Sequence, residues 1–186
     1  AYSKGKISNC STDAVSTVKS YYAGGIAGYS TGEISNCTNS GVVTSSNDYA
    51  WGIAGYSTGE ISNCTNNGTI SSYDYHAGGI AGYSTAEINS CTNNGKVNFY
   101  SYGGGIAGYS TAEINNCTNS GDVTSSSSYY SYGGGIVGYS SANMNNCTNN
   151  GTVISSYRSK SYAGGIVGKI YCSYDAKEII ISNVYN

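Results

Sequence analysis

Six cysteines recur at a nearly constant spacing, and thiols in a regular file suggest metal, redox or disulfide chemistry. They are separated by 27, 27, 27, 26 and 30 residues: Cys10, Cys37, Cys64, Cys91, Cys117 and Cys147. There is no Cys-x-x-Cys pair, and the single histidine, His76, lies outside the cysteine motif, which argues against zinc. Stacked copies would place neighbouring Cβ atoms about 4.8 Å apart with parallel side chains, beyond the usual reach of a disulfide. We therefore expect buried free thiols that pack as small apolar side chains.

Four glutamates occupy one position of the same pattern, and a file of carboxylates could bind calcium. They are Glu33, Glu60, Glu87 and Glu113, bordered by Lys6 and Asn143. No aspartate-rich loop accompanies them, and an exposed file of charge is screened by water and salt. A solvated face and a row of weak metal sites are the two interpretations, and we expect no resident metal.

Two glycine patterns, at residues 103–108 and 133–138, satisfy the Gly-x-Gly-x-x-Gly dinucleotide fingerprint. That fingerprint works only where a strand leads into a helix whose N-terminus faces the pyrophosphate, and here the following residues lead into another strand. The many serines have no base nearby to activate them. The sequence therefore indicates no catalytic residue, no cofactor and no enzyme.

Composition excludes two further classes of partner. A net charge of -2 without a basic stripe gives no support for nucleic-acid binding. No apolar run approaches the roughly 18–20 residues that span a bilayer, the longest being residues 179–181, so no membrane insertion is expected. A surface poor in charge and rich in Ser, Thr, Asn and Tyr favours an extracellular or cell-surface location.

The chain is built from tandem copies of one short unit. The unit at residues 23–39 returns four more times with the core Gly-Ile-Ala-Gly or Gly-Ile-Val-Gly, and each copy contains three short extended pieces. No sustained helical period is present. The sequence therefore predicts an all-β fold, a single β-solenoid of six to seven coils of about 27 residues with three short strands per coil. Glycines in the Asn-Gly and Ser-Gly turns are expected to supply positive φ angles at the corners.

Stacking such coils predicts inward ladders of equivalent residues. The first is Ile26, Ile53, Ile80, Ile106, Ile136 and Ile166, and the second is Ile7, Ile34, Ile61, Ile88, Ile114 and Met144. The third is Val43, Ile70, Val97, Val123 and Val153, and the cysteines form a fourth. The spacing from Ile34 to Cys37 is odd, so both can face inward only if the strand bends or bulges between them.

Aromatic residues are concentrated at two repeat positions and in the loops that differ in length. One tyrosine follows each glycine core, and another, replaced once by His76, precedes it; both files could brace the stack or offer ring faces to sugars. Trp51 replaces a glycine of the pattern and is expected to be an exposed stacking surface. The candidates for a binding surface are Trp51, Tyr49, Tyr73, Tyr75, Tyr100, Tyr129, Tyr130 and Tyr157.

The residues that could mediate self-association lie where the repeat pattern ends. The repeats occupy residues 1–168, and residues 169–186 form an irregular segment followed by a strand that copies residues 34–39. That strand could complete a coil in its own chain or in a neighbour by strand addition. The candidate residues are Ile179, Ile181, Val184 and Cys172, and Cys172 is the better candidate for a disulfide, to Cys147 or to another subunit.

The Gly-Ile-Ala-Gly cores, each followed by an Asn-Cys-Thr-Asn-x-Gly corner, resemble the GLUG repeat of bacterial surface proteins. The resemblance covers residues 2–168. It implies the secreted or wall-attached repeat region of an adhesin-like protein or of a large extracellular peptidase, in which the repeats are not the catalytic part. Residues 1–186 contain no proline and hence no Leu-Pro-x-Thr-Gly sorting signal, so surface anchoring of that kind is not expected to be encoded in them.

Three functions are compatible with these observations. The leading hypothesis is a non-enzymatic extracellular structural or adhesive solenoid that self-associates head to tail into a fibre, because neither end shows an obvious polar cap. The alternative is an adhesin module that binds glycans or a host surface through the Tyr- and Ser-rich loops. A minor alternative is an ice-binding solenoid that uses the file of threonines after each cysteine.

Overall fold

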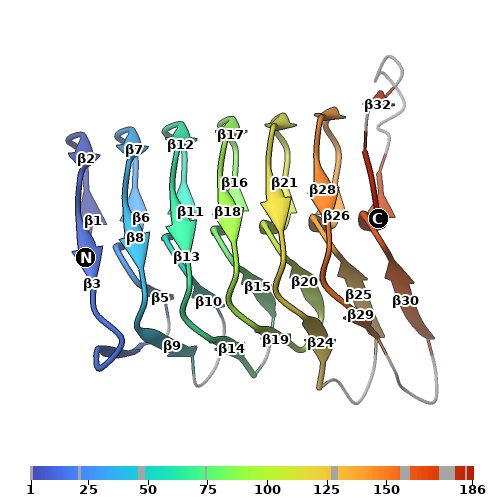
Figure 1. Cartoon of the computed structure of the whole chain (residues 1–186), viewed down its shortest axis with the longest axis horizontal. Helices are drawn as coiled ribbons and strands as arrows, with labels where there is room; N and C mark the ends of the chain where they lie inside the picture. Colours follow the sequence, from blue (N-terminus) through green and yellow to red (C-terminus); the bar gives the residue numbers. More distant parts are fainter. Residues whose placement is uncertain are drawn as a thin grey trace.

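The structure, a computed structural model, describes residues 2–20, 22–45, 49–73, 75–126, 130–155, 160–171, 179–182 and 184–186. These residues form strands, turns and bends and contain no helix, so none of them provides a helix that could cross a membrane. The chain winds into a β-solenoid whose coils lie side by side along the long axis, with the two termini at opposite ends (Figure 1). The all-β solenoid predicted from the repeats is confirmed.

Five parallel sheets run along the solenoid, and each receives one short strand from each successive coil. Sheet A contains β1 (Tyr2–Ser3), β6 (Ala27–Ser30), β11 (Ala54–Ser57), β16 (Ala81–Ser84), β21 (Ala107–Ser110), β26 (Val137–Ser140) and β31 (Val167–Ile170). Sheet B contains β2 (Ile7–Ser8), β7 (Ile34–Ser35), β12 (Ile61–Ser62), β17 (Ile88–Asn89), β22 (Ile114–Asn115), β27 (Met144–Asn145) and β32 (Ile181–Ser182). Sheet C contains β3 (Ser11–Thr12), β8 (Thr38–Asn39), β13 (Thr65–Asn66), β18 (Thr92–Asn93), β23 (Thr118–Asn119) and β28 (Thr148–Asn149).

The other two sheets flank the loops of variable length. Sheet D contains β4 (Thr17–Lys19), β9 (Val42–Ser45), β14 (Ile70–Ser72), β19 (Val97–Phe99), β24 (Val123–Ser125) and β29 (Val153–Ile154). Sheet E contains β5 (Tyr22–Gly24), β10 (Tyr49–Trp51), β15 (His76–Gly78), β20 (Tyr102–Gly104), β25 (Tyr130–Gly134) and β30 (Lys160–Gly164). Equivalent residues pair in register, as Ile61 does with Ile34 and Ile88.

A coil therefore has five strands, and the expectation of three was wrong in this detail. The piece Glu-Ile-x-x-Cys-Thr-Asn divides between sheets B and C, because the residue before each cysteine adopts a left-handed conformation. The φ angle is 54° at Asn36 and 55° at Ser90. This turn confirms the predicted bend, since Ile34 and Cys37 are both fully buried despite their odd spacing. Sheet E was not predicted as a separate strand position.

The prediction that glycines supply positive φ angles at the corners was wrong. No glycine among the described residues has a positive φ, and the left-handed positions are taken by asparagine and once by serine. The glycines are needed because the coils approach closely. A Cβ added to Gly68, Gly95 or Gly121 would overlap the carbonyl oxygen of the equivalent glycine one coil earlier. Side chains are therefore excluded along this corner of the solenoid.

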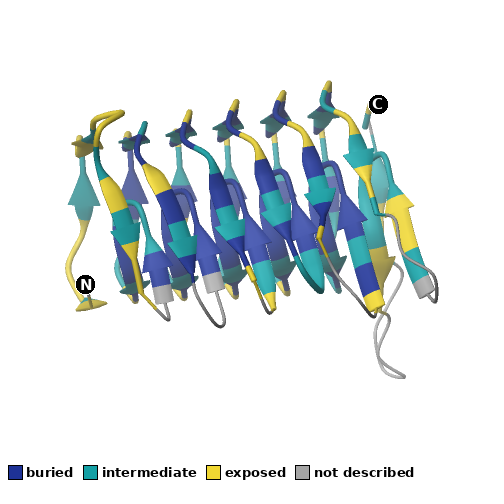
Figure 2. Ribbon diagram, turned by 90° about the horizontal axis from the view of Figure 1, so that it is seen from below, coloured by how far each residue is buried: buried dark blue, intermediate teal, exposed yellow. Residues whose placement is uncertain are grey.

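The predicted ladders form the core. In the inner coils the aliphatic residues of all three ladders are completely buried, as are the cysteines from Cys37 to Cys147. Their terminal members, among them Ile7, Ile166 and Val153, are only partly buried. Figure 2 shows this gradient, with buried residues in the middle coils and exposed ones toward both ends. Burial of each inner aliphatic side chain contributes roughly 1.5–3 kcal/mol.

A ladder of buried asparagines is formed by the last residues of the sheet C strands. Its buried members are Asn39, Asn66, Asn93, Asn119 and Asn149. Each Nδ2 donates to the Oδ1 of the asparagine in the next coil at 2.7–2.8 Å. The same Nδ2 donates to the carbonyl of the glycine two residues later at 2.8–3.0 Å. Each side-chain amide thereby stabilises the turn of its own coil and links that coil to the next. The buried Nδ2 and Oδ1 atoms are hydrogen-bonded as a result.

The C-terminal residues complete the last rung within their own chain. Ile181 pairs with Met144, Thr148 forms a bridge with Tyr185, and Asn149 donates to Asn186 at 2.8 Å. Ile181 and Val184 pack partly buried against the core at the positions of the aliphatic and cysteine ladders. Ile179 is half-buried at the start of this segment, and Cys172 lies outside the described residues.

Candidate functional site

Tyrosines form a column on the outer face of sheet A. Its members are Tyr2, Tyr29, Tyr56, Tyr83, Tyr109 and Tyr139, with neighbouring ring centroids 4.7–5.0 Å apart. From Tyr29 to Tyr139 the neighbouring rings are parallel to within 10°. Burial, followed by the neighbouring phenols, raises the pKa of Tyr56 and Tyr139, so these hydroxyls stay protonated at neutral pH.

A second column stands on sheet E beside the first. Tyr102, Tyr132 and Tyr162 stack in it at 5.1–5.3 Å, and His76 contacts Tyr102 edge-on at 5.0 Å. The two columns touch, because Tyr102 meets Tyr139 at 5.7 Å with the rings nearly perpendicular. At the C-terminal end the Nζ of Lys169 lies 5.0 Å from the ring centroid of Tyr132 and 5.3 Å from that of Tyr139.

The geometry of the columns favours bracing of the stack. Rings that stack on one another turn their faces toward the neighbouring rings and leave mainly their edges and hydroxyls to solvent. Such parallel pairs contribute about 0.5–1.5 kcal/mol each beyond burial. A sugar ring that stacks on tyrosine needs an exposed ring face, so it must be sought outside the regular part of the columns.

His76 is the one histidine of the chain, a residue type whose ordinary pKa lies near neutral pH. Burial lowers its pKa to about 4. The unfolded chain has the ordinary histidine pKa of about 6.5, so between these values the unfolded state binds a proton that the folded state excludes. The contribution of His76 to the free energy of unfolding is therefore fully present above pH 6.5 and is lost as the pH falls toward 4.

We expect the free energy of unfolding to be about 2 kcal/mol lower at pH 5 than at pH 7.5 because of this one group. His76→Tyr, which introduces the residue found at this position in the other coils, should remove that part of the pH dependence. Urea unfolding of both proteins at the two pH values measures it. The same pH dependence in the variant would contradict the assignment to His76.

Two exposed tyrosines, Tyr75 and Tyr130, flank the place where the connections between sheets D and E change in length. Two residues separate β19 from β20, whereas three separate β14 from β15 and four separate β24 from β25. The short loop thus lies between two longer ones. The resulting hollow, the tyrosine groove, is lined by Tyr75, Ser101, Tyr102, Tyr130 and Tyr132, and has a volume of about 390 Å³.

The floor of the tyrosine groove is fixed by backbone hydrogen bonds. The N–H groups of Ser101 and Tyr102 both donate to the carbonyl of Tyr75 at 3.1 Å, and that of Tyr132 donates to Ser101 at 2.8 Å. The walls are more open, since Tyr75 is 47% and Tyr130 is 51% exposed. A fixed floor between accessible rings suits an extended ligand with flat apolar faces and hydroxyl groups.

Phe99 packs inside the solenoid against Gly103 and Gly133 of sheet E. It is the single phenylalanine of the chain and is completely buried at the end of β19. A Cβ added to Gly103 would overlap its ring, and one added to Gly133 would come within 2.9 Å of its Cζ. Both glycines stand where Ala23, Ala50 and Ala77 stand in earlier coils of sheet E. These two glycines therefore make room for one large ring.

The structure separates the predicted binding residues. Tyr75 and Tyr130 meet in the tyrosine groove, while Tyr73 is exposed and Tyr100 half-buried outside its lining. Tyr129 and Tyr157 lie outside the described residues, and only the backbone of Tyr49 is described. Tyr102 and Tyr132 were assigned only to a column, although the 26-residue coil spacing already marked this place.

The prediction that Trp51 is an exposed stacking surface was wrong. Its side chain is only 1% exposed and lies against the sheet A strands β11 and β16. A Cβ on Gly55 or Gly82 would overlap the indole, so those two glycines create the space that it occupies. Trp51 and Phe99 are thus each accommodated by two glycines, in different coils.

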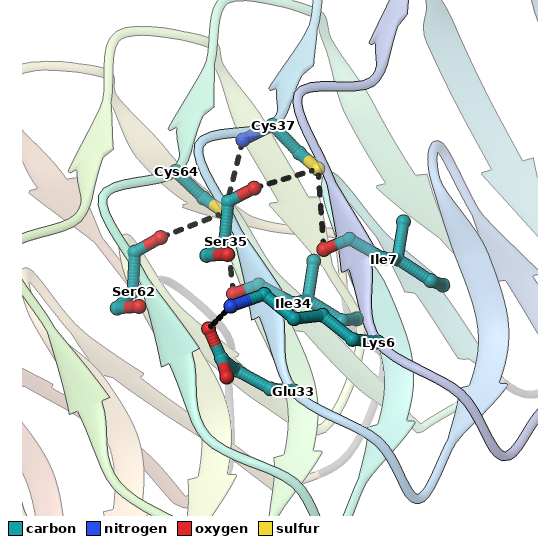
Figure 3. A network of polar contacts seen from close by, with 8 residues as sticks. All are labelled: Lys6, Ile7, Glu33, Ile34, Ser35, Cys37, Ser62 and Cys64. Carbon is teal, nitrogen blue, oxygen red and sulfur yellow. Dashed lines mark hydrogen bonds and ion pairs between the residues drawn. The ribbon is translucent and has the colours of Figure 1, made fainter.

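The glutamates and cysteines show ordinary surface and core contacts (Figure 3). Glu33 pairs with Lys6 at 2.9 Å, and the hydrogen bond from Lys6 lowers the pKa of that carboxyl. Asn115 donates to Glu87 at 2.8 Å and Asn143 to Glu113 at 3.3 Å. In the described part of the chain, no group of three or more His, Cys, Asp or Glu residues could hold a metal ion.

The cysteine ladder is closed to solvent in the inner coils. The thiol of Cys37 donates to the carbonyl of Ser35 at 3.3 Å, and its backbone N–H contacts the sulfur of Cys64 at 3.4 Å. Burial raises the pKa of the Cys37 thiol, which keeps it protonated and unreactive at neutral pH. Cys37 and the four later members are buried free thiols as predicted, whereas Cys10 in the first coil is exposed.

Two segments of the chain match a model of a known repeat family. Residues 19–44 and 99–124 each match the model described as the GLUG motif. Two coils of the solenoid carry the GLUG motif. This confirms the resemblance seen in the sequence, and each GLUG match extends from the end of one sheet D strand through one full turn to the next. The second GLUG match contains Phe99, Ser101 and Tyr102, so the floor of the tyrosine groove belongs to it.

A solved structure shares the fold of these GLUG coils. It comes from Bacteroides ovatus and is provisionally described as an immunoglobulin A1 protease. The superposition has a TM-score of 0.67 at 20% sequence identity and covers 97% of this chain and 66% of the Bacteroides chain. The chain thus spans about two thirds of that protein's length, and the likeness shows a common solenoid. No curated protein matches the sequence.

Proposed function

We propose that this chain is a non-catalytic binding module of a secreted or cell-surface protein and that its tyrosine groove binds glycans. The observation that carries the proposal is the gathering of four tyrosines, Tyr75, Tyr102, Tyr130 and Tyr132, around one hollow on an otherwise regular solenoid. The GLUG matches support a surface-type repeat protein. A role in adhesion follows if the glycan belongs to a host or neighbouring cell.

The chemistry of the groove fits a sugar. Tyrosine combines an apolar ring face with a hydroxyl, and this suits the C–H face and the hydroxyl groups of a pyranose. Burial raises the pKa of Tyr102, so its phenol remains a neutral hydrogen-bonding group at physiological pH. A rigid floor lowers the ordering cost of binding because the protein changes little.

A glycan array probed with labelled protein tests this function. We expect a defined set of glycans to bind the wild type and to bind Tyr130→Ala at least tenfold more weakly, because an exposed wall of the groove is removed. Tyr83→Ala is the matched control, since Tyr83 stands in the sheet A column away from the groove and its loss should leave binding unchanged. Absence of any glycan binding by the wild type, or equal loss in both variants, would contradict the proposal.

Head-to-tail association into a fibre remains a prediction of the sequence. It is favoured by the partly buried aliphatic residues of the end coils, Ile7, Ile166 and Ile181, whose counterparts inside the stack are fully covered. Light scattering on concentrated protein tests it, and a monomer at every concentration would exclude it.

A further inference from the structure

The strands that carry the tyrosine columns are almost free of charge. The described strands of sheets A and E contain no aspartate or glutamate. Their residues that are charged at neutral pH are two lysines, Lys160 in β30 and Lys169 in β31. Both lie in the coil that follows Tyr130 and Tyr132, which line the tyrosine groove. The groove therefore has cationic neighbours on one side, in strands that are otherwise uncharged.

Lys169 takes the place of a tyrosine in the sheet A column. It pairs in register with Tyr139. Its Nζ turns back to the preceding coil, where it lies 5.0 Å from the ring centroid of Tyr132 and 5.3 Å from that of Tyr139. The faces of aromatic rings attract a cation at such distances. The ammonium group is therefore held against a tyrosine that lines the groove.

Lys160 takes the register position beside Tyr130, an exposed wall of the groove. Strands β25 and β30 are parallel and pair Tyr130 with Lys160 and Tyr132 with Tyr162. Residues paired in this way are neighbours on one sheet, about 4.8 Å apart along the hydrogen-bonding direction. The coil of residues 160–170 thus places one lysine next to each of the two tyrosines on this side of the groove.

The described acidic residues lie outside sheets A and E. The glutamates Glu33, Glu60, Glu87 and Glu113 each precede a strand of sheet B, Asp13 lies between β3 and β4, and Asp122 precedes β24. In the described part of the chain, the one ion pair joins Lys6 to Glu33. The charge of Lys169 is therefore not offset by a described carboxylate, and an anionic group of a ligand could pair with it.

We propose that the tyrosine groove prefers acidic glycans and that Lys169 binds the anionic group, a carboxylate or a sulfate, of the sugar next to Tyr132. This inference rests on the proposed binding of glycans in the groove. A sugar that contacts the Tyr132 ring can bring an anionic substituent to the ammonium group 5.0 Å from the centroid of that ring. The flexible stem of lysine lets its point charge move from the ring to the ligand.

An array that holds each sugar backbone in a neutral, a carboxylated and a sulfated form tests this preference. We expect the wild type to bind the acidic forms about tenfold more tightly than the neutral form of the same backbone, as for a charge-assisted hydrogen bond. The carboxylated and sulfated forms show which anionic group is preferred. The preference should decrease as the salt concentration rises, because salt screens exposed charges.

Substitutions of Lys169 assign the preference to its charge. Lys169→Gln should abolish most of the preference for acidic forms and leave the binding of neutral forms unchanged, whereas Lys169→Arg should retain it. Lys160→Gln should reduce the preference less. The matched control is Lys4→Gln, because the Nζ of Lys4 lies 6.0 Å from the ring centroid of Tyr2 in the first coil, away from the groove. It removes the same charge and should leave the preference unchanged.

Three outcomes would overturn the proposal. They are equal binding of neutral and acidic forms by the wild type, an unchanged preference in Lys169→Gln, and an equal loss of preference in Lys4→Gln. Each of them leaves glycan binding by the tyrosine groove intact. Absence of binding to every form on the array would instead contradict the proposed function, and this inference with it.

Discussion

Replacing Gly103 with alanine should destabilise the solenoid by about 2–3 kcal/mol, because the new Cβ would overlap the ring of Phe99. Phe99→Ser alone should cost about 3–5 kcal/mol through the loss of a fully buried aromatic side chain. In the double variant, however, the added methyl group enters the space left by the ring. Gly103→Ala should therefore become neutral or stabilising once Phe99 is serine.

Urea unfolding of the four proteins in this double-mutant cycle measures the effect. Serine and alanine already occur together at these two repeat positions in an earlier coil, as Ser45 and Ala50. The backbone therefore accepts the combination. Gly133→Ala is a graded control, because its Cβ would meet only the far edge of the Phe99 ring at 2.9 Å and should cost less. Simple additivity of Phe99→Ser and Gly103→Ala would show that the two positions are not coupled.

Asn93→Ala should lower the free energy of unfolding by about 3–5 kcal/mol. The change removes hydrogen bonds of 2.7 Å to both neighbouring asparagines and one of 2.8 Å to the carbonyl of Gly95. The partners are buried and would be left unsatisfied, at about 1–3 kcal/mol for each group.

The adjacent Asn94 provides the matched control for this ladder. It is exposed and donates to Asn67 at 2.9 Å on the outside of the solenoid. Asn94→Ala should change the stability by no more than about 0.5 kcal/mol. Similar losses in Asn93→Ala and Asn94→Ala, measured by urea unfolding, would mean that the buried ladder has no special role.

The solenoid was predictable because the repeat period places equivalent residues in register. The ladders through Ile34, Val43 and Cys37 follow from that alone, and the odd spacing between Ile34 and Cys37 required a bend that Asn36 provides with a φ of 54°. The role of the glycines was not predictable in the same way. It depends on how closely the coils approach, which the local turn pattern does not express.

Departures from the repeat were visible in the sequence, but their effects on burial and on the surface could not be predicted from it. Trp51 reads as an exposed ring because it replaces glycine, yet Gly55 and Gly82, from neighbouring strands of sheet A, leave space that buries it. The 26-residue spacing shows one short coil. That Tyr75 and Tyr130, 55 positions apart in the numbering, face the resulting hollow depends on the stacking of three coils, which only the structure supplies.

The central claim is that a short loop between two longer ones creates a glycan site. One serine inserted after Tyr100 would bring this coil to 27 residues and raise the floor of the tyrosine groove while keeping all four of its tyrosines. Exposed loops tolerate such insertions, so the fold should be retained. Calorimetric titration of the best glycan from the array into both proteins tests the claim directly. We predict binding to the wild type and at least a tenfold loss in the insertion variant, and equal affinity of the two proteins would contradict the claim.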